Sequence, residues 1–147
     1  MTPWIARRII YPLQELACRR PTFAYLDELE RSQWLSRADI EQLQQRKLAR
    51  LLQAALAHSP WHAGRLREAG LAEVVASGSC TLSDLQMLPL MDKHDAREHR
   101  DQLVWHGVPG GAFRYNTGGS SGEPLIFHFG RERQASDAAG RMRARRW

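Results

Sequence analysis

A glycine- and hydroxyl-rich stretch near the C-terminal end most constrains how this chain can fold. Residues 114–130 read RYNTGGSSGEPLIFHFG, in which three glycines and three hydroxyl residues lie between two arms that carry apolar and aromatic side chains. The central run suits no regular element, whereas AFRYN (112–116) and LIFHF (125–129) suit strands. VPGG, just before, reads as a turn. The sequence therefore predicts two strands bridged by a loop.

The part of the chain before this loop is predicted to be helical, most clearly at residues 36–58. Ser36 is expected to be the N-cap, and the carboxylate of Asp39 three residues later favours the positive end of the helix. Apolar side chains fall on one stripe of this helix, namely Ile40, Leu43, Leu48, Leu51, Leu52, Ala55 and Leu56.

Proline, glycine and capping residues place the remaining helices. Pro60 ends the first helix or begins the next, which is expected to end at Gly70, where a left-handed backbone costs least. Asp92 is expected to cap a helix that runs to about Leu103. Looser or shorter helices are predicted at residues 4–18 and 22–35, separated by Pro21, from Thr81 or Ser83 to Leu88, and from Arg131 onward, with Gly140 weakening the last one.

The chain thus divides into three expected segments of one domain. Residues 1–107 form a helical lead-in, residues 108–130 form the strand-loop-strand unit, and residues 131–147 form a basic helix. A chain of 147 residues is long enough to bury one core. It holds no apolar run of membrane-spanning length and no continuous signal-peptide core, so a cytoplasmic protein without a membrane span is expected. Cys18 and Cys80 match no redox or zinc pattern and are expected to be reduced and non-catalytic.

The net charge of +5 comes almost entirely from the C-terminal segment. Residues 131–147 contain six arginines and two acidic residues, while residues 1–130 are nearly balanced. A basic tail of this kind favours a solvated or partner-facing helix surface. Nucleic-acid binding is a weaker alternative, because the tail lacks interleaved base-stacking aromatics and any nucleic-acid module.

The composition of the loop suits an anion. Glycines permit positive backbone dihedrals, and consecutive amides that turn inward form a concavity for phosphate oxygens. The loop matches neither the Walker pattern nor the dinucleotide fingerprint, and it lacks a cation of its own. An ordinary hairpin loop therefore stays open as an interpretation. No metal site is expected, because Pro60 separates His58 from His62 and no third ligand is close in sequence.

The stretch TGGSSGEPL, residues 117–125, resembles the phosphate loop of adenylate-forming enzymes. The likeness is most specific to the phenylacetate-coenzyme A ligase branch and its CapK-like members, which act in capsular polysaccharide biosynthesis. LLQAALAHSPWHAGRLREAGL (51–71) and LSDLQMLPLMDKHDAREH (82–99) resemble further segments of that branch, and so does the opening stretch 7–36. The resemblance therefore covers nearly the whole chain.

This resemblance implies an incomplete large domain of the adenylate-forming (ANL) fold, an α/β class that becomes α+β in this chain. It also implies a two-step reaction. A carboxylate attacks the α-phosphate of ATP, bound with Mg²⁺, and a thiol, usually that of coenzyme A, then displaces AMP. The loop would hold the β- and γ-phosphates through Thr117, Gly118, Gly119, Ser120, Ser121 and Gly122. Leu125 departs from the lysine that many relatives outside this branch carry.

The later motifs of the family do not occur in this sequence, so no catalytic residue is assigned. We expect an N-terminal fragment that lacks the C-terminal domain, from a truncated or split gene, and that is inactive alone. The alternative is a non-catalytic helical adaptor or split-enzyme half. It would bind a protein partner, such as the missing C-terminal part or another copy, through its basic tail and an exposed apolar face.

Overall fold

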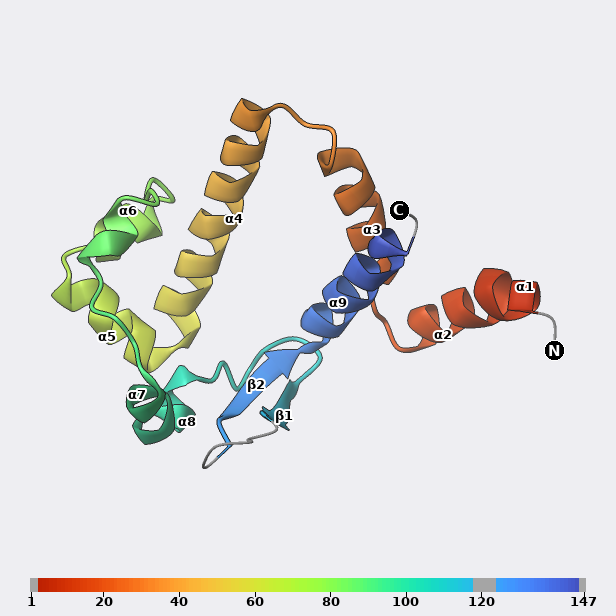
Figure 1. Cartoon of the computed structure of the whole chain (residues 1–147). Coiled ribbons are helices and arrows are strands. Elements are labelled where there is room, and N and C mark those ends of the chain that lie inside the picture. Colours follow the sequence, from red (N-terminus) through yellow and green to blue (C-terminus); the bar gives the residue numbers. More distant parts are fainter. Residues whose placement is uncertain (1–2, 118–123, 146–147) are drawn as a thin grey trace. The chain divides into compact units, whose positions relative to one another are not determined.

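The structure is a computed structural model that describes residues 3–117 and 124–145. The chain divides into two compact units. The first consists of Met1–Leu35, Pro109–Gly111 and Gly130–Trp147, and the second of Ser36–Val108 and Ala112–Phe129. Helices dominate, with one two-stranded antiparallel sheet (Figure 1). A mixed helix and strand class, as the sequence predicts, is thereby confirmed.

The first unit begins with a helical rod made of three consecutive pieces. These are α1 (Pro3–Ile5), a π-helical turn η1 (Ala6–Ile10) and α2 (Tyr11–Ala17). After a turn comes α3 (Thr22–Ser32), which packs against α9 (Arg131–Ala144). The two helices predicted on either side of Pro21 are confirmed, although they end at residues 17 and 32.

Small side chains hold α3 and α9 close together. Ala135 and Ala139 on α9 are fully buried, and Leu26 on α3 is almost fully buried. Alanine leaves room for the facing helix to approach, which places the apolar contact near the two backbones. Of the arginines of α9, Arg133 and Arg141 are exposed and Arg131 and Arg143 are half-buried.

A buried carboxylate fixes the turn between α2 and α3. Glu15 is 2% exposed, and its side chain accepts a hydrogen bond from the hydroxyl of Thr22. The guanidinium of Arg20 lies 3.3 Å from the other carboxylate oxygen. Because a buried charge is tolerated only when it is paired and hydrogen-bonded, these contacts tie the end of α2 to the first turn of α3.

The second unit begins with α4 (Arg37–His58), the longest helix. The hydroxyl of Ser36 accepts from the amide of Asp39 at 3.2 Å, so the predicted N-cap is confirmed. The apolar stripe is only partly buried: Leu52 lies in the core, while Ile40 and Leu51 are exposed.

The core of this unit lies where α4 meets two shorter helices, α5 (Pro60–Glu68) and α6 (Ala72–Ala76). Its buried members are Leu52, Leu66, Leu71, Val75 and Cys80. The start of α5 at Pro60 is as predicted, and Gly70 has the expected positive φ of 71°. The helix α6 was not predicted, because its five residues are too short to show a period.

Two capping predictions in the next segment had different outcomes. Asp92 caps α7 (Lys93–Glu98), as predicted, and forms a capping box with Asp95. The helix ends early, however, and α8 (Arg100–Leu103) follows after a break at His99. The expected helix at 81–88 is a short 3-10 turn, η2 (Asp84–Met87), and neither expected residue caps it through its side chain. Instead, the amide and hydroxyl of Thr81 donate to Asp84.

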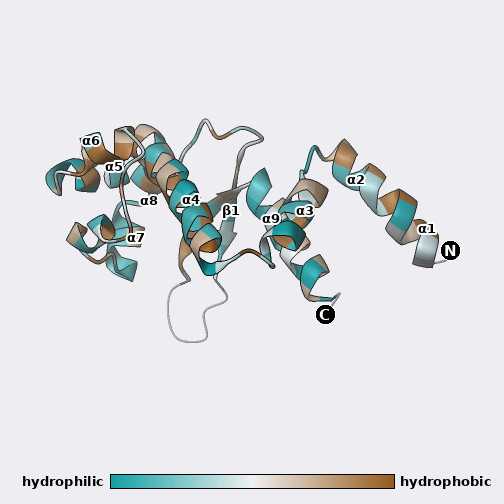
Figure 2. Cartoon of the chain, turned by 90° about the horizontal axis from the view of Figure 1, so that it is seen from above, coloured by the Kyte–Doolittle hydropathy of each residue, from teal (hydrophilic) through white to brown (hydrophobic). Residues whose placement is uncertain are grey.

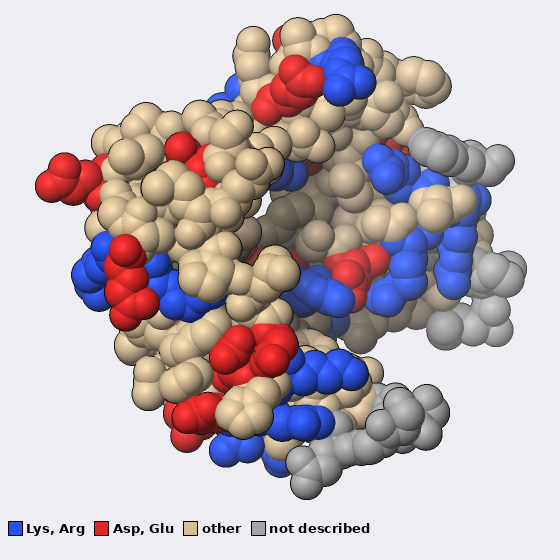
Figure 3. Space-filling model, turned by 60° about the vertical axis from the view of Figure 1, so that its left-hand side comes forward, with Lys and Arg blue, Asp and Glu red and all other residues tan. Residues whose placement is uncertain are grey.

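The surface is mixed in polarity. Over the face drawn in Figure 3, acidic and basic side chains lie next to one another. Among the residues described, no helix is long and apolar enough to cross a membrane. Cys18 and Cys80 are both free thiols, as expected.

Candidate phosphate-binding loop

Two strands frame the predicted phosphate loop. β1 (Ala112–Asn116) has the predicted bounds, and β2 (Ile126–Gly130) begins one residue later than predicted. They pair as neighbours in an antiparallel hairpin. The predicted strand-loop-strand arrangement is therefore confirmed at both arms.

Thr117 and Leu125 close the base of the loop. The amide of Thr117 donates to the carbonyl of Leu125 at 3.0 Å. In return, the amide of Leu125 donates to the hydroxyl oxygen Oγ1 of Thr117, also at 3.0 Å. This pair of bonds extends the ladder one step beyond the strands and sets the span that the loop bridges.

The hydroxyl of Thr117 accepts this bond and retains its own proton. A threonine hydroxyl offers one proton and two acceptor lone pairs, and the bond from Leu125 uses only a lone pair. Thr117 is exposed, so its proton can be donated to an anion at the loop. Of the six predicted site residues, Thr117 is described here, whereas Gly118, Gly119, Ser120, Ser121 and Gly122 lie outside the described residues.

Register places a basic residue on one face of the hairpin. Thr117 faces Leu125, so three steps down the ladder bring Arg114 opposite His128, and alternation puts both on the same face. Arg114 is exposed, and the ring atom Nδ1 of His128 is buried without a hydrogen-bond partner among the described residues. Arg114 precedes the loop within β1.

The other face of the hairpin is aromatic. Tyr115 faces Phe127 with ring centroids 5.5 Å apart, and Phe113 faces Phe129 at 6.4 Å. Tyr115 and Phe129 also meet diagonally at 5.6 Å. Such cross-strand pairs stabilise a two-stranded ribbon that is marginal by itself. Three of these rings, Phe113, Tyr115 and Phe127, are exposed.

The histidines that could have suggested a metal site have structural contacts instead. His58 stacks on Trp105 with ring centroids 3.8 Å apart. His62 packs edge-on against Trp61. Burial, and then the charge of Arg65, lower the pKa of His62. Within the described part of the chain, no group of three His, Cys, Asp or Glu residues is placed to hold a metal ion.

The thiol of Cys80 also has a structural place. It lies in the core of the second unit and is completely buried. Burial, and then the charge of Asp84, raise the pKa of this thiol. A thiol with a raised pKa is a weak nucleophile at neutral pH, because the thiolate is the reactive form.

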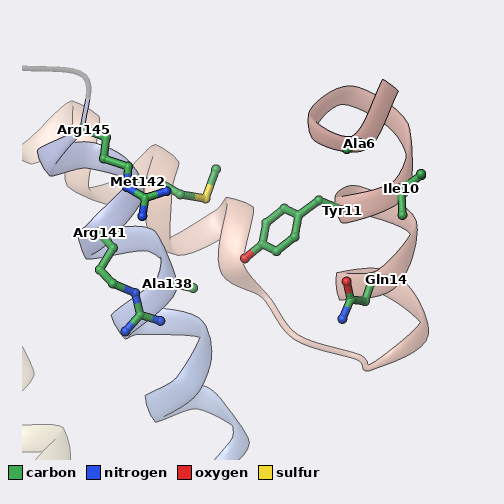
Figure 4. A pocket seen from close by; sticks show the side chains of 8 residues that line it. All are labelled: Ala6, Ile10, Tyr11, Gln14, Ala138, Arg141, Met142 and Arg145. Carbon is green, nitrogen blue, oxygen red and sulfur yellow. The ribbon is translucent and has the colours of Figure 1, made fainter. Parts of the chain in front are cut away.

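The first unit contains a separate cavity of about 670 Å³. Ala6, Ile10, Tyr11 and Gln14 line it from the N-terminal rod, and Ala138, Arg141, Met142 and Arg145 line it from α9. Figure 4 shows Tyr11 extending from α2 towards α9. Burial, and then the carboxylate of Glu15, raise the pKa of its phenol, which therefore stays protonated. No local sequence pattern indicates this cavity, because the residues that line it are far apart along the chain.

Comparison of the chain with protein-family models, with curated proteins and with solved structures finds no match in any of the three.

Proposed function

We propose that this chain is the N-terminal part of an ATP-dependent acyl-adenylate-forming ligase, similar to phenylacetate-coenzyme A ligases and CapK-like proteins. The observation that carries the proposal is the stretch TGGSSGEPL at 117–125, held at its base by Thr117 and Leu125 between two paired strands. A loop with a fixed span and many glycines can present several backbone amides to one group of phosphate oxygens.

The role of the loop would be to position and stabilise charge. Its amides and the hydroxyls of Thr117, Ser120 and Ser121 would hold the β- and γ-phosphates of ATP, which leave as pyrophosphate when a carboxylate attacks the α-phosphate. Donors already aimed at developing charge lower the barrier without reorganisation. Mg²⁺ would arrive on the nucleotide, in keeping with the lack of a three-ligand metal group among the described residues.

Adenylation itself is expected to need the later motifs of the family, which this sequence does not contain. No nucleophile paired with a base is assigned in the described residues, and the thiol of Cys80 is buried. We therefore assign phosphate binding to this chain. The acyl chemistry and any use of coenzyme A are assigned to a complementary part.

Calorimetry with nucleotides tests this proposal. The 147-residue chain is titrated with ATP, ADP, AMP and pyrophosphate in the presence of Mg²⁺, beside a loop variant carrying Gly119→Val, Ser120→Ala and Ser121→Ala. A control variant carries Ser83→Ala and Ser136→Ala, at two exposed positions outside the loop. Circular dichroism establishes that all three proteins are folded.

We expect ATP and pyrophosphate to bind the parent and the control. AMP should bind at least about tenfold more weakly, because it lacks the β- and γ-phosphates that the loop would hold. The loop variant should lose binding. A folded parent that binds none of the four ligands would refute phosphate binding by this chain alone.

The alternative, a non-catalytic helical adaptor, is favoured by the exposed aromatic face of the hairpin. Phe113, Tyr115 and Phe127 form a contiguous apolar surface of the kind that marks protein partners. If nucleotide binding fails, this function predicts that a separately expressed C-terminal part of an adenylate-forming ligase binds the chain. It also predicts that Tyr115→Ser with Phe127→Ser weakens that binding.

A further inference from the structure

The N-terminal rod carries a stripe of exposed apolar side chains. Its members are 39 to 74% exposed and follow one another at helical spacing: Ile5, Ile9, Leu13 and Leu16. Trp4 at the start of the rod is also exposed. In Figure 2 the apolar colour recurs along α1 and α2. A helix surface that faces water is normally polar, so this stripe is an excess of apolar area.

The cavity of the first unit lies along another side of the rod. The rod lines the cavity of that unit through Ala6, Ile10, Tyr11 and Gln14, which are displaced around the rod from the exposed stripe. Tyr11 also packs edge-on against Phe23 of α3, with ring centroids 6.0 Å apart. The cavity side therefore takes part in the fold of this unit, although Ile10 on it is also 41% exposed, and the stripe of Ile5, Ile9, Leu13 and Leu16 lies outside the cavity.

The charge near the open stripe is positive. Within residues 3–20 the only acidic side chain is Glu15, which is buried and engaged by Thr22 and Arg20. Arg8 within the rod and Arg19 just after it are exposed. Among the described residues 3–20, the exposed charges therefore include cations and no carboxylate.

We propose that the rod α1–α2 lies on an anionic lipid surface. An apolar stripe with arginines beside it and an aromatic residue near one end is the pattern of a helix that lies in the plane of a bilayer interface. The stripe enters the boundary of the acyl chains, and Arg8 and Arg19 meet the headgroups. This inference does not depend on the proposed nucleotide binding, because the loop contributes nothing to it.

The same charges argue against a second copy of the chain as the occupant. Two identical stripes that face each other bring the arginines of both copies together, and Glu15 is not available to compensate them. Like charges placed opposite one another at an interface weaken association. A bilayer with anionic headgroups supplies the missing negative charge.

Co-flotation with vesicles tests the proposal on the full 147-residue chain. One set of vesicles contains phosphatidylcholine alone, and the other contains about 30% phosphatidylglycerol, an anionic lipid. The stripe variant carries Ile9→Gln, Leu13→Gln and Leu16→Gln. The matched control carries three equivalent changes at exposed apolar positions of the second unit: Leu51→Gln, Leu82→Gln and Met87→Gln. A charge variant carries Arg8→Gln and Arg19→Gln.

We expect the parent and the control to float with anionic vesicles about tenfold or more better than with neutral ones. The stripe variant should not float with either kind of vesicle and should stay at the bottom of the gradient. The charge variant should lose about tenfold or more of its affinity for the anionic vesicles, because two arginines near the surface no longer contribute. Circular dichroism of every variant shows whether it kept its helices. A folded parent that floats with neither vesicle overturns the proposal. So does a control that loses as much binding as the stripe variant, or a stripe variant that only converts a parent dimer to a monomer.

Discussion

The hydroxyl of Thr117 accepts the amide proton of Leu125 while the amide of Thr117 donates to the carbonyl of Leu125, both at 3.0 Å. The two residues therefore close a nine-residue span from both directions. The first bond needs a side-chain oxygen at position 117, and the second needs only the backbone. A substitution at this position can thus remove one bond and leave the other.

Thr117→Val removes the acceptor at nearly unchanged shape. The amide of Leu125 then loses its partner, and we expect its hydrogen exchange to accelerate. The same change removes the hydroxyl assigned to the phosphates. Each lost hydrogen bond contributes about 0.5–1.5 kcal/mol, so nucleotide binding at the loop should weaken by at least roughly two- to tenfold. Thr117→Ser retains the hydroxyl and is the control. If the amide of Leu125 exchanges its hydrogen at the same rate in the Val and Ser variants, the side chain of Thr117 does not form the hydrogen bond to that amide.

A second prediction concerns the core of the second unit. Leu66 is 2% exposed and Leu51 is 66% exposed, although both are leucines on helices of that unit. Leu66→Ala leaves a cavity and should cost about 2–5 kcal/mol of unfolding free energy. Leu51→Ala should change it by less than about 0.5 kcal/mol, as surface substitutions do. Urea unfolding followed by circular dichroism measures both, and similar losses in the two variants would show that the assigned core is wrong.

The contrast between these two leucines shows where the sequence stops being informative. Local signals sufficed for Ser36 and Asp92, because a cap is formed by side chains and amides within three residues of each other. The wide stripe of α4 did not reveal which of its members are buried. Which residues of α4 are buried depends on where α5 and α6 pack, and the apolar period of α4 does not predict these contacts.

The loop shows the same limit. Composition predicted both strands and the break between them, because aromatic residues favour strands and glycines disfavour them. It did not predict the aromatic face or the place of Arg114, because both follow from the register, and the register is fixed by the pair Thr117 and Leu125. The cavity of the first unit joins residues about 130 positions apart, which no local pattern encodes.

Two glycines should respond in opposite directions to alanine. Gly140 lies within α9, and a Cβ there would meet nothing within 4 Å. Gly140→Ala should therefore stabilise the protein by up to about 1 kcal/mol through helix propensity. Gly70 ends α5 with φ at 71°, so Gly70→Ala should destabilise it by about 1 kcal/mol or more, because a side chain disfavours that backbone.

Thermal and urea unfolding of the two glycine variants distinguish propensity from packing. A destabilised Gly140→Ala variant would mean that this face of α9 is covered in solution. A neutral Gly70→Ala variant would mean that the end of α5 does not need the left-handed backbone.

The last prediction concerns the capping box at Asp92. Its carboxylate accepts hydrogen bonds from the amides of Asp95 and His94 at 2.9 and 2.7 Å. These bonds, that of Asp95 first, lower the pKa of Asp92 below its ordinary value of 3.8. A lowered folded-state pKa means that the charged cap stabilises α7 at every pH above the unfolded pKa. That contribution is lost as the pH falls through the still lower folded pKa. We expect the amide of Ala96, in the first turn of α7, to lose protection from exchange below about pH 4.

Substitution separates the charge of this cap from its geometry. Asp92→Asn keeps a side-chain acceptor that is as good an N-cap but does not titrate, so the protection of Ala96 should become less dependent on pH in this range. Asp92→Ala removes the acceptor and should lower protection at every pH. An Asp92→Asn variant with the full pH response of the parent would assign that response to groups other than Asp92, and would refute the role given to the charge of Asp92.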